Sequence, residues 1–273
     1  MAMKAFTSGL CYLLVLVLVF GPIGLAAGCA KPTTTNPFTG SMAEILEPLF
    51  APSPGDMARD AFDYSDPDKR RRAISALSSA AWGGQDVYVR LYRVSAKTDG
   101  DDTVRAAAIR ALGIHGSVDD AKLIASNLSH ESVFVRWEAA TALQKVHHPA
   151  VVTPLIGAVK DDDSDVRMAA VKALGQYSRS AVYDALIGAL NDSNFGVARS
   201  ARLSLSTLTG QDLGMNSRRW LDWSGKHSDQ LFDNRQAYRW QPYERPRGLL
   251  DKVQFWKDHH PVSPQPATGQ DEG

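Results

Sequence analysis

Apolar and small residues recur along the middle of the chain with a period of 31 residues. Each copy opens with Val, has Ala four positions later and Leu eight positions later, and these offsets lie on one face of a helix. A second apolar pattern upstream keeps the same period, so each unit predicts two short helices. The three positions of the first pattern are occupied by Val104, Val135, Val166 and Val197, by Ala108, Ala139, Ala170 and Ala201, and by Leu112, Leu143, Leu174 and Leu205.

One such helix pair cannot bury its apolar face alone, which predicts that neighbouring pairs stack around a shared core. A more degenerate copy places Ala73 and Leu77 in the same roles, 35 residues before Ala108 and Leu112. We therefore expect an all-α fold, an α-solenoid of about five helix pairs. A residue able to cap a helix precedes each second helix, namely Asp66, Asp101 or Asp102, Ser132, Asp163 and Asn194.

The recurring pattern Asp…Val-Arg…Ala…Ala-Leu-Gly resembles the HEAT-like repeats of bacterial proteins, a family that includes bilin lyase subunits. The resemblance covers about residues 57–208. It implies that the second helices line the concave side of the stack. It also implies that the Arg after each Val pairs with the capping acid of its own or a neighbouring repeat, until Ala198 interrupts the series. These arginines are Arg70, Arg105, Arg136 and Arg167.

The N-terminus has the layout of an export signal, with an apolar run from Leu10 to Phe20 that is too short to span a bilayer. Small residues then precede Cys29, and this segment resembles a bacterial lipoprotein signal, which implies that Cys29 carries the lipid. The segment departs from the family pattern at Ala26, where Leu is preferred. Cleavage by an ordinary signal peptidase and an uncleaved anchor are the alternatives. The expected location is the bacterial cell envelope, at the outer membrane or the periplasmic face of the inner membrane.

Composition divides the chain into five parts. We expect a signal peptide at 1–28, a Pro/Thr-rich tether at 29–42, repeats at 43–208, a C-terminal capping segment at 209–258 and a disordered tail at 259–273. Trp220 and Trp223 in the capping segment share one helix face, so they either cover the last repeat or form a surface for stacking a ligand. A final amphipathic helix is expected at 248–257. The segment 209–214, followed by both Trp, resembles the ends of bacterial HEAT-repeat lipoproteins of unassigned function.

Charge argues against a nucleic-acid partner, because 30 basic and 30 acidic residues leave a formal net charge of zero. The strongest basic run, Lys69 to Arg72, is either a solvated helix face or a site for an anionic envelope component. If Cys11 leaves with the signal and Cys29 carries lipid, no free thiol remains as a nucleophile.

No group of residues forms a convincing catalytic or metal-binding set, so we expect no enzyme activity, no cofactor and no metal. The acidic run from Asp161 to Asp165 lacks the Gly and Glu of a calcium loop, and a capping turn is the simpler interpretation. His130-Glu131 occurs once, whereas the HEAT-like enzyme deoxyhypusine hydroxylase uses repeated His-Glu pairs for its iron. The pair His147-His148 lacks a companion ligand at a recognised spacing.

A binding surface is expected on the second helices. Trp137 and Met168 would form its centre, and cationic residues would form its rims, since aromatic and Arg side chains dominate binding hot spots. The alternative is that Trp137 covers the seam between two repeats. The sequence thus predicts a membrane-tethered, non-catalytic scaffold for protein–protein interaction; the alternatives are a HEAT-like lyase or hydroxylase subunit, or a module that binds envelope polymers through the C-terminal aromatics. The expected rim residues are Arg71, Arg110, Lys172 and Arg199.

Overall fold

The computed structural model describes residues 53–240 and 263–270, all of which belong to one compact unit, Pro52–Gly273. Cys29, the signal segment, the tether and the helix expected at 248–257 lie outside the described residues. Within the described ranges, no helix is long and apolar enough to cross a membrane.

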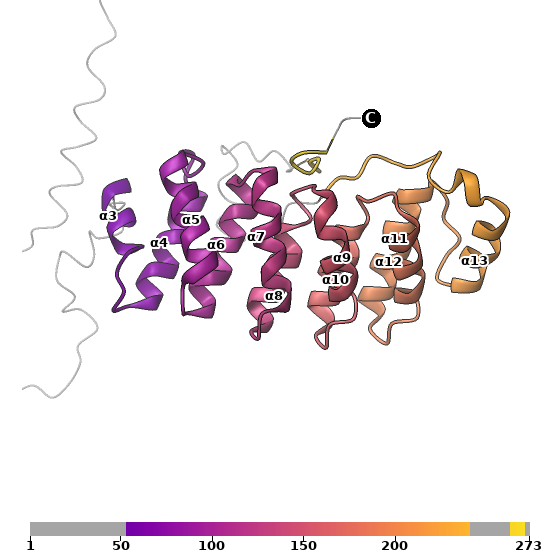
Figure 1. Cartoon of the computed structure of the whole chain (residues 1–273), viewed down its shortest axis with the longest axis horizontal. Helices are drawn as coiled ribbons and strands as arrows, with labels where there is room; N and C mark the ends of the chain where they lie inside the picture. The colour runs from indigo at the N-terminus through magenta and orange to yellow at the C-terminus, as the bar shows by residue number, and fades with distance from the viewer. Residues whose placement is uncertain (1–52, 241–262, 271–273) are drawn as a thin grey trace, which may run out of the picture. The chain divides into compact units, whose positions relative to one another are not determined.

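Helices follow one another in chain order as a stack of pairs (Figure 1). This arrangement confirms the predicted all-α solenoid. Over residues 53–240 and 263–270 the only β-type pairing is at isolated bridges. The α-helices are α3 (Pro54–Asp60), α4 (Pro67–Ser79), α5 (Asp86–Thr98), α6 (Asp102–His115), α7 (Ala121–Ser126), α8 (Val133–Ala142), α9 (Val152–Ala158), α10 (Ser164–Leu174), α11 (Ser180–Ala189), α12 (Phe195–Thr209) and α13 (Ser217–Lys226), and the short 3-10 turns are η2 (Val118–Asp120), η3 (Asn127–Ser129), η4 (Pro149–Val151) and η5 (Ser228–Gln230).

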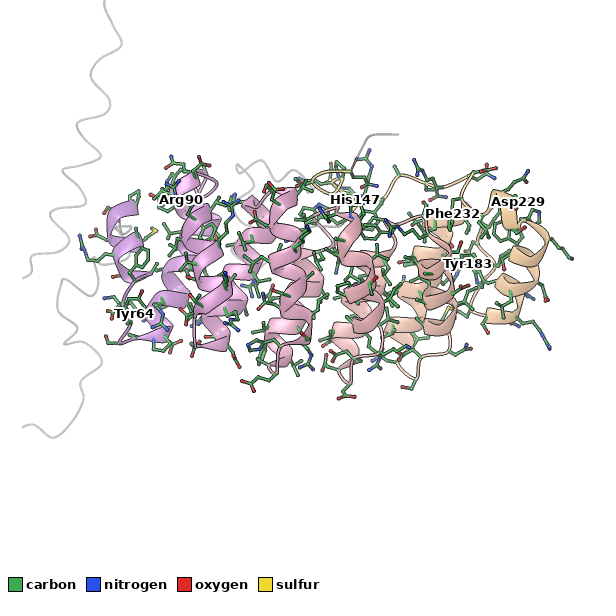
Figure 2. All side chains as sticks on the ribbon, viewed as in Figure 1. Tyr64, Arg90, His147, Tyr183, Asp229 and Phe232 are labelled. Carbon is green, nitrogen blue, oxygen red and sulfur yellow. The ribbon has the colours of Figure 1, made fainter. Side chains whose placement is uncertain are left out.

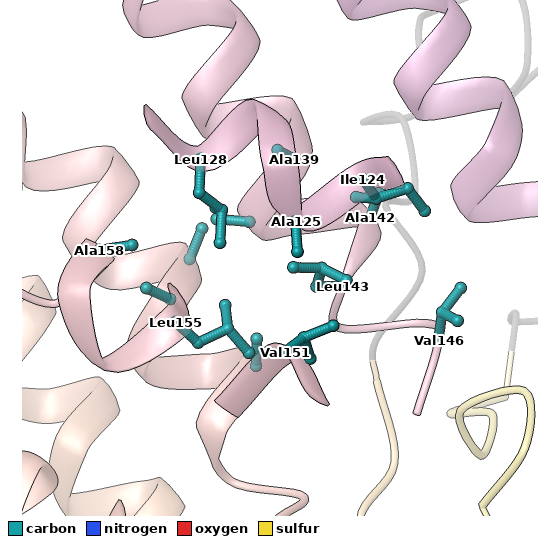
Figure 3. Packing of buried hydrophobic residues seen from close by; sticks show 14 of the residues in the cluster. Ile124, Ala125, Leu128, Ala139, Ala142, Leu143, Val146, Val151, Leu155 and Ala158 are labelled. Carbon is teal, nitrogen blue, oxygen red and sulfur yellow. The ribbon is translucent and has the colours of Figure 1, made fainter. Parts of the chain in front are cut away.

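The core is built from the repeating stripe predicted by the sequence (Figure 3). All the stripe residues that open the copies, from Val104 to Val197, are fully buried. Small residues let the second helices α4, α6, α8, α10 and α12 lie close together, and these helices contact one another more extensively than the first helices do. Gly113 of α6 marks one such approach, because a Cβ added there would lie 2.8 Å from the Cβ of Ala142 in α8.

Side-chain caps begin most of the second helices. Asp66, Asp101, Asp163 and Asn194 each accept a hydrogen bond from a backbone N–H of the first turn, as expected, and Asp101 rather than Asp102 caps α6. Ser132 differs, since its side chain makes no capping hydrogen bond to α8. The acidic run before α10 therefore contributes a capping turn.

Helix α13 packs against α11 at the last repeat (Figure 2). Trp220 is fully buried, its Nε1 donates to the carbonyl of Gly214 at 2.8 Å, and Tyr183 Oη donates to the carbonyl of Trp220 at 2.9 Å. Trp223 is half-buried and its ring stacks on His227 with 5.0 Å between centroids. The Trp220 indole is consequently unavailable for stacking a ligand.

Residues 263–270 differ from the disordered tail expected after residue 259. The backbone N–H of Thr268 donates to the carbonyl of Lys145 at 2.7 Å, and the N–H of His147 donates to the carbonyl of Thr268 at 2.8 Å. Ala267 is buried, with 3% of its surface exposed. The Pro- and Gln-rich composition suggested disorder, but the backbone pairing and the burial of Ala267 hold this segment against the repeats.

Candidate functional site

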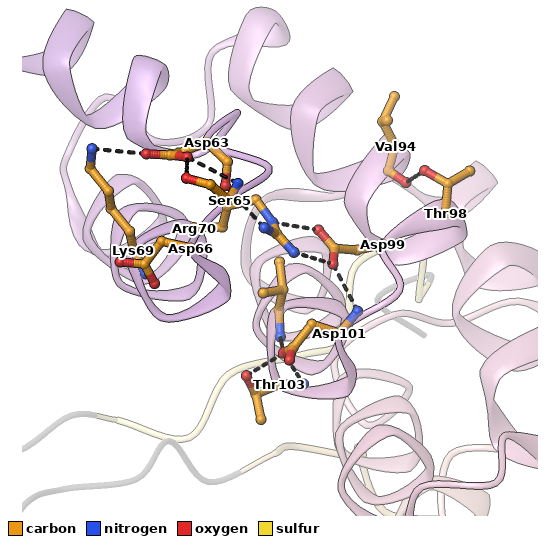
Figure 4. Close-up of polar contacts among 11 residues, drawn as sticks. Asp63, Ser65, Asp66, Lys69, Arg70, Val94, Thr98, Asp99, Asp101 and Thr103 are labelled. Atoms are coloured by element: carbon orange, nitrogen blue, oxygen red, sulfur yellow. Dashed lines mark hydrogen bonds and ion pairs between the residues drawn. The ribbon is translucent and has the colours of Figure 1, made fainter.

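Arginine–aspartate pairs link successive repeats at one end of the helices. Arg136 donates through Nε and Nη2 to both carboxylate oxygens of Asp161, at 2.7 and 3.0 Å, and Arg167 pairs with Asp192 in the same way at 2.7 and 2.9 Å. Arg70 makes the equivalent bidentate pair with Asp99 (Figure 4). We call these three pairs the ladder. Bidentate pairs of this kind fix both distance and orientation, so the ladder sets how one repeat sits on the next.

The carboxylates of the ladder lie two residues before the capping residue of the next second helix. Each also accepts the backbone N–H of that capping residue, as Asp161 does from Asp163 at 2.9 Å. The resemblance to HEAT-like repeats implied pairing with the capping acid itself, and the structure assigns this role to a separate aspartate. The hydrogen bonds from Arg167 lower the pKa of Asp192 from its usual value of 3.8. Burial raises the pKa of Asp161, but the hydrogen bonds from Arg136 and Asp163 outweigh it and the pKa is lowered.

Arg105 is the one arginine of the predicted series that the ladder leaves without a carboxylate within the described residues. The position that should hold its partner, 31 residues from Asp99 and from Asp161, is occupied by His130. His130 Nδ1 accepts the N–H of Ser132 at 3.1 Å, so it replaces the aspartate in the turn but not in the ion pair. Arg105 donates to the carbonyl of Lys97, and its buried Nε has no hydrogen-bond partner within the described part of the chain. His130 therefore belongs to a repeat turn.

Neighbouring carboxylates offset most of the basic run at residues 69–72. Lys69 lies 3.1 Å from both Asp60 and Asp63, and Arg70 is a ladder residue. Arg71 pairs with Asp68 of its own helix at 3.0 Å. Only Arg72 of this run forms no ion pair within the described ranges, which favours the interpretation as a solvated helix face.

Exposed aromatic, apolar and cationic side chains share the outer side of the second helices α8, α10 and α12. The exposed fraction is 69% for Phe134, 37% for Trp137 and 72% for Phe195. Met168 lies between α8 and α12 and is half-buried, at 3.4 Å from the position of a Cβ on Gly196. We call this surface the second-helix face, made of Phe134, Trp137, Met168, Lys172, Phe195, Arg199 and Leu203.

The four predicted rim cations fall into two groups. Lys172 and Arg199 are exposed and form no ion pair with any other described residue. Arg110 pairs with the buried carboxylate of Glu138 on the adjacent second helix, and Arg71 pairs with Asp68. The charges of Arg110 and Arg71 are therefore balanced locally, and Lys172 and Arg199 provide the uncompensated positive charge near Trp137 and Met168.

Phe134 and Phe195 did not emerge from the sequence as surface residues. Both lie at the first turn of a second helix, where the copies in α6 and α10 have the polar residues Thr103, Asp102 and Asp165. An aromatic residue at a position that is polar in the other copies was the available signal. The repeat pattern is defined by the residues that stay constant, so it does not reveal a position that departs from the other copies.

No group of three or more His, Cys, Asp or Glu side chains within residues 53–240 and 263–270 is arranged to hold a metal ion. His147 stacks on Tyr177 with 4.6 Å between ring centroids, and its Nδ1 lies 3.2 Å from Gln176 Oε1. His148 N–H donates to Tyr177 Oη at 3.2 Å. These histidines therefore contribute to the packing between repeats.

Comparison with known proteins supports the repeat assignment. Residues 121–206 match the HEAT repeats family, and no curated protein matches the chain. The structure of YibA from Escherichia coli is similar over 68% of each chain, with 22% identity and a TM-score of 0.50.

Two further solved structures are similar to this chain at lower scores. A chain of the CpcE–CpcF complex of phycocyanin lyase from Nostoc is similar over 56% of this chain and 99% of its own, with 18% identity and a TM-score of 0.46. Human deoxyhypusine hydroxylase is similar over 67% of this chain and 87% of its own, with 14% identity and a TM-score of 0.27. At such identities a likeness concerns the fold alone. Residues 121–206 therefore match HEAT repeats, and the described helix pairs form an α-solenoid fold.

Proposed function

We propose that this protein is a membrane-tethered, non-catalytic HEAT-repeat scaffold that binds a protein partner at the bacterial cell envelope. The observation that carries the proposal is the second-helix face, where Phe134, Trp137 and Phe195 are exposed and the cations have no ion-pair partner among the described residues. Burying a large apolar side chain contributes about 1.5–3 kcal/mol, so an exposed group of this kind is a source of binding free energy.

The chemistry of the second-helix face defines the kind of partner. Central aromatic side chains with neighbouring cations have the composition of protein-binding hot spots. Lys172 and Arg199 lack carboxylate partners among the described residues, so they are available to an acidic surface. We therefore expect a partner that presents apolar side chains bordered by Asp or Glu.

The rigidity of the stack supports a scaffold role. The ladder and the close packing of the second helices hold the exposed residues of different repeats in fixed positions relative to one another. Preorganisation lowers the entropic cost of binding, because the surface does not have to be ordered when the partner arrives. The signal-like N-terminus and Cys29 supply the proposed attachment to the membrane.

A non-catalytic role fits the positions of the titratable groups. Carboxylates with lowered pKa values, such as Asp161 and Asp192, are held by arginines that join repeats. Their ion pairs connect successive repeats. Stoichiometric iron or zinc in the purified protein would favour the lyase or hydroxylase alternative.

The proposal is tested with a Trp137→Ala/Phe195→Ala variant of the full chain, expressed in its host and crosslinked in cells. We expect the variant to lose at least tenfold of the crosslinked protein partner, since both aromatic anchors are removed. Lys172→Glu/Arg199→Glu should weaken the same crosslink through repulsion from the acidic partner.

Leu221→Ala is the matched control, because Leu221 is 53% exposed but lies on α13, away from the second-helix face. It should leave the crosslinked partner unchanged. A folded Trp137→Ala/Phe195→Ala protein that retained every partner of the wild type would overturn the proposal. The fold of each variant is checked by circular dichroism and thermal unfolding.

A further inference from the structure

A polar cavity lies at the edge of the repeats, and none of its described lining residues belongs to the second-helix face. Its volume is about 370 Å³, near the lower end of the range of about 300–1,000 Å³ for small-molecule sites. Three stretches of chain meet there: the turns near His147 and Gln176, the segment around residues 235–239, and the C-terminal segment with Pro266 and Gln270. His147 marks this edge in Figure 2.

The walls of the cavity carry positive charge. Arg235 and Arg239 line it, and no Asp or Glu is among its described lining residues. Neither guanidinium forms an ion pair within the described part of the chain. Two arginines on one polar cavity favour an anion, because guanidinium groups form strong, charge-assisted hydrogen bonds with carboxylates and phosphates.

Uncommitted hydrogen-bonding groups add a second feature. The Oε1 atom of Gln270 is buried and has no hydrogen-bond partner among the residues that the structure describes. A buried acceptor left unpaired costs about 1–3 kcal/mol, so a hydroxyl or amine donor from a ligand would remove a penalty. The side chains of Ser178 and Gln236 line the same cavity and make no hydrogen bond among the described residues.

One wall is held in place by contacts that are already satisfied. Gln176 donates through Nε2 to the carbonyl of Leu143 at 2.7 Å, and its Oε1 lies 3.2 Å from His147 Nδ1. The ring of His147 stacks on Tyr177. This wall is fixed by the repeats, and Arg235, Arg239 and Gln270 line the cavity from the other two segments.

From this geometry we propose that the cavity binds a small hydroxylated anion, either a sugar acid or a sugar phosphate. The arginines take the carboxylate or phosphate, and Gln270, Gln236 and Ser178 take the hydroxyl groups. The size of the cavity suits a single sugar unit. The cavity and the second-helix face share no described residue. Loss of the proposed protein partner would therefore not affect the proposal for the cavity.

Isothermal titration calorimetry on the full chain in mild detergent tests the proposal with three probes: glucuronate, glucose 1-phosphate and glucose. We expect the wild type to bind at least one of the anions at least tenfold more tightly than glucose. Whichever anion binds more tightly identifies the carboxylate or the phosphate as the preferred group.

Arg235→Ala/Arg239→Ala should weaken binding of that anion at least tenfold. Arg218→Ala/Arg219→Ala is the matched control, since it removes the same charge from exposed arginines of α13 and should bind as the wild type does. Gln270→Leu should weaken binding of both anions, because the acceptor for a hydroxyl group is lost. Failure of the wild type to bind either anion, equal binding of glucose, or an equal loss in both arginine variants would overturn the proposal.

Discussion

At the scale of single residues, the ladder places charged side chains where they are largely shielded from solvent. The side chains of Arg136 and Asp161 are only 15% and 9% exposed, so each depends on the other for compensation of its charge. Arg105 occupies the same position in an earlier repeat, but the sequence position of its aspartate partner is occupied by His130. The two arginines are thus a natural pair for measuring what one ladder contact contributes.

We expect Arg136→Met to lower the free energy of unfolding by about 3–5 kcal/mol, because it leaves the carboxylate of Asp161 buried without its partner. Arg105→Met removes a hydrogen bond to a carbonyl but also a buried, unpaired Nε, and should change the stability by about 1 kcal/mol or less. Chemical denaturation of both variants measures the difference. Equal losses would contradict the assignment of the ladder.

The cost of Arg136→Met should also depend on pH. The pKa of Asp161 in the folded wild type is below its usual value of 3.8, so the stability that the pair contributes is complete above that pH and is lost as the pH falls through the folded pKa. The difference in unfolding free energy between wild type and variant should therefore be largest at neutral pH and should shrink as the solution becomes acidic.

At the scale of secondary-structure elements, the spacing of the second helices is set by small residues. A Cβ on Gly113 of α6 would lie 2.8 Å from the Cβ and 2.9 Å from the Cα of Ala142 in α8. Gly188 of α11 has the opposite surroundings, with no atom within 4 Å of an added Cβ. A Gly→Ala substitution should thus lower the stability at Gly113 but not at Gly188.

Gly113→Ala is expected to destabilise the protein by about 1–3 kcal/mol, since α6 and α8 must move apart to admit the methyl group. Gly188→Ala should be neutral or stabilising by up to about 1 kcal/mol, because alanine favours the helix and meets no neighbour. Thermal unfolding of both variants compares them, and a loss at Gly188 as large as that at Gly113 would show that close packing is not the cause.

The repeating elements were predictable because their residues recur in strict register. Val135 and Leu143, for example, are buried where the period places them. The surface was harder to predict, since Phe134 is a departure from the repeat and Arg110 is paired with a residue 28 positions away. The cavity was not predictable, because it is formed by segments such as 235–239 and 263–270 whose approach depends on the tertiary fold.

At the scale of the whole molecule, the proposed scaffold role depends on attachment through Cys29. If the proposed lipid anchor is present, Cys29→Ser should shift the protein from the membrane fraction to the soluble fraction, or leave an uncleaved precursor, because the variant has no thiol to acylate at that position. Fractionation with mass spectrometry of the mature N-terminus measures both outcomes. An unchanged membrane fraction with an unchanged N-terminus would show that another segment provides the anchor.

The return of the C-terminal segment to the middle of the stack changes how the protein would come apart. In a series of units that touch only their neighbours, the last units can open one after another from the free end. Here Thr268 pairs with the backbone on both sides of Val146, so the intervening repeats lie inside a closed span of chain. Unfolding from that end first requires release of this contact, so the contact opposes stepwise unfolding of the last repeats.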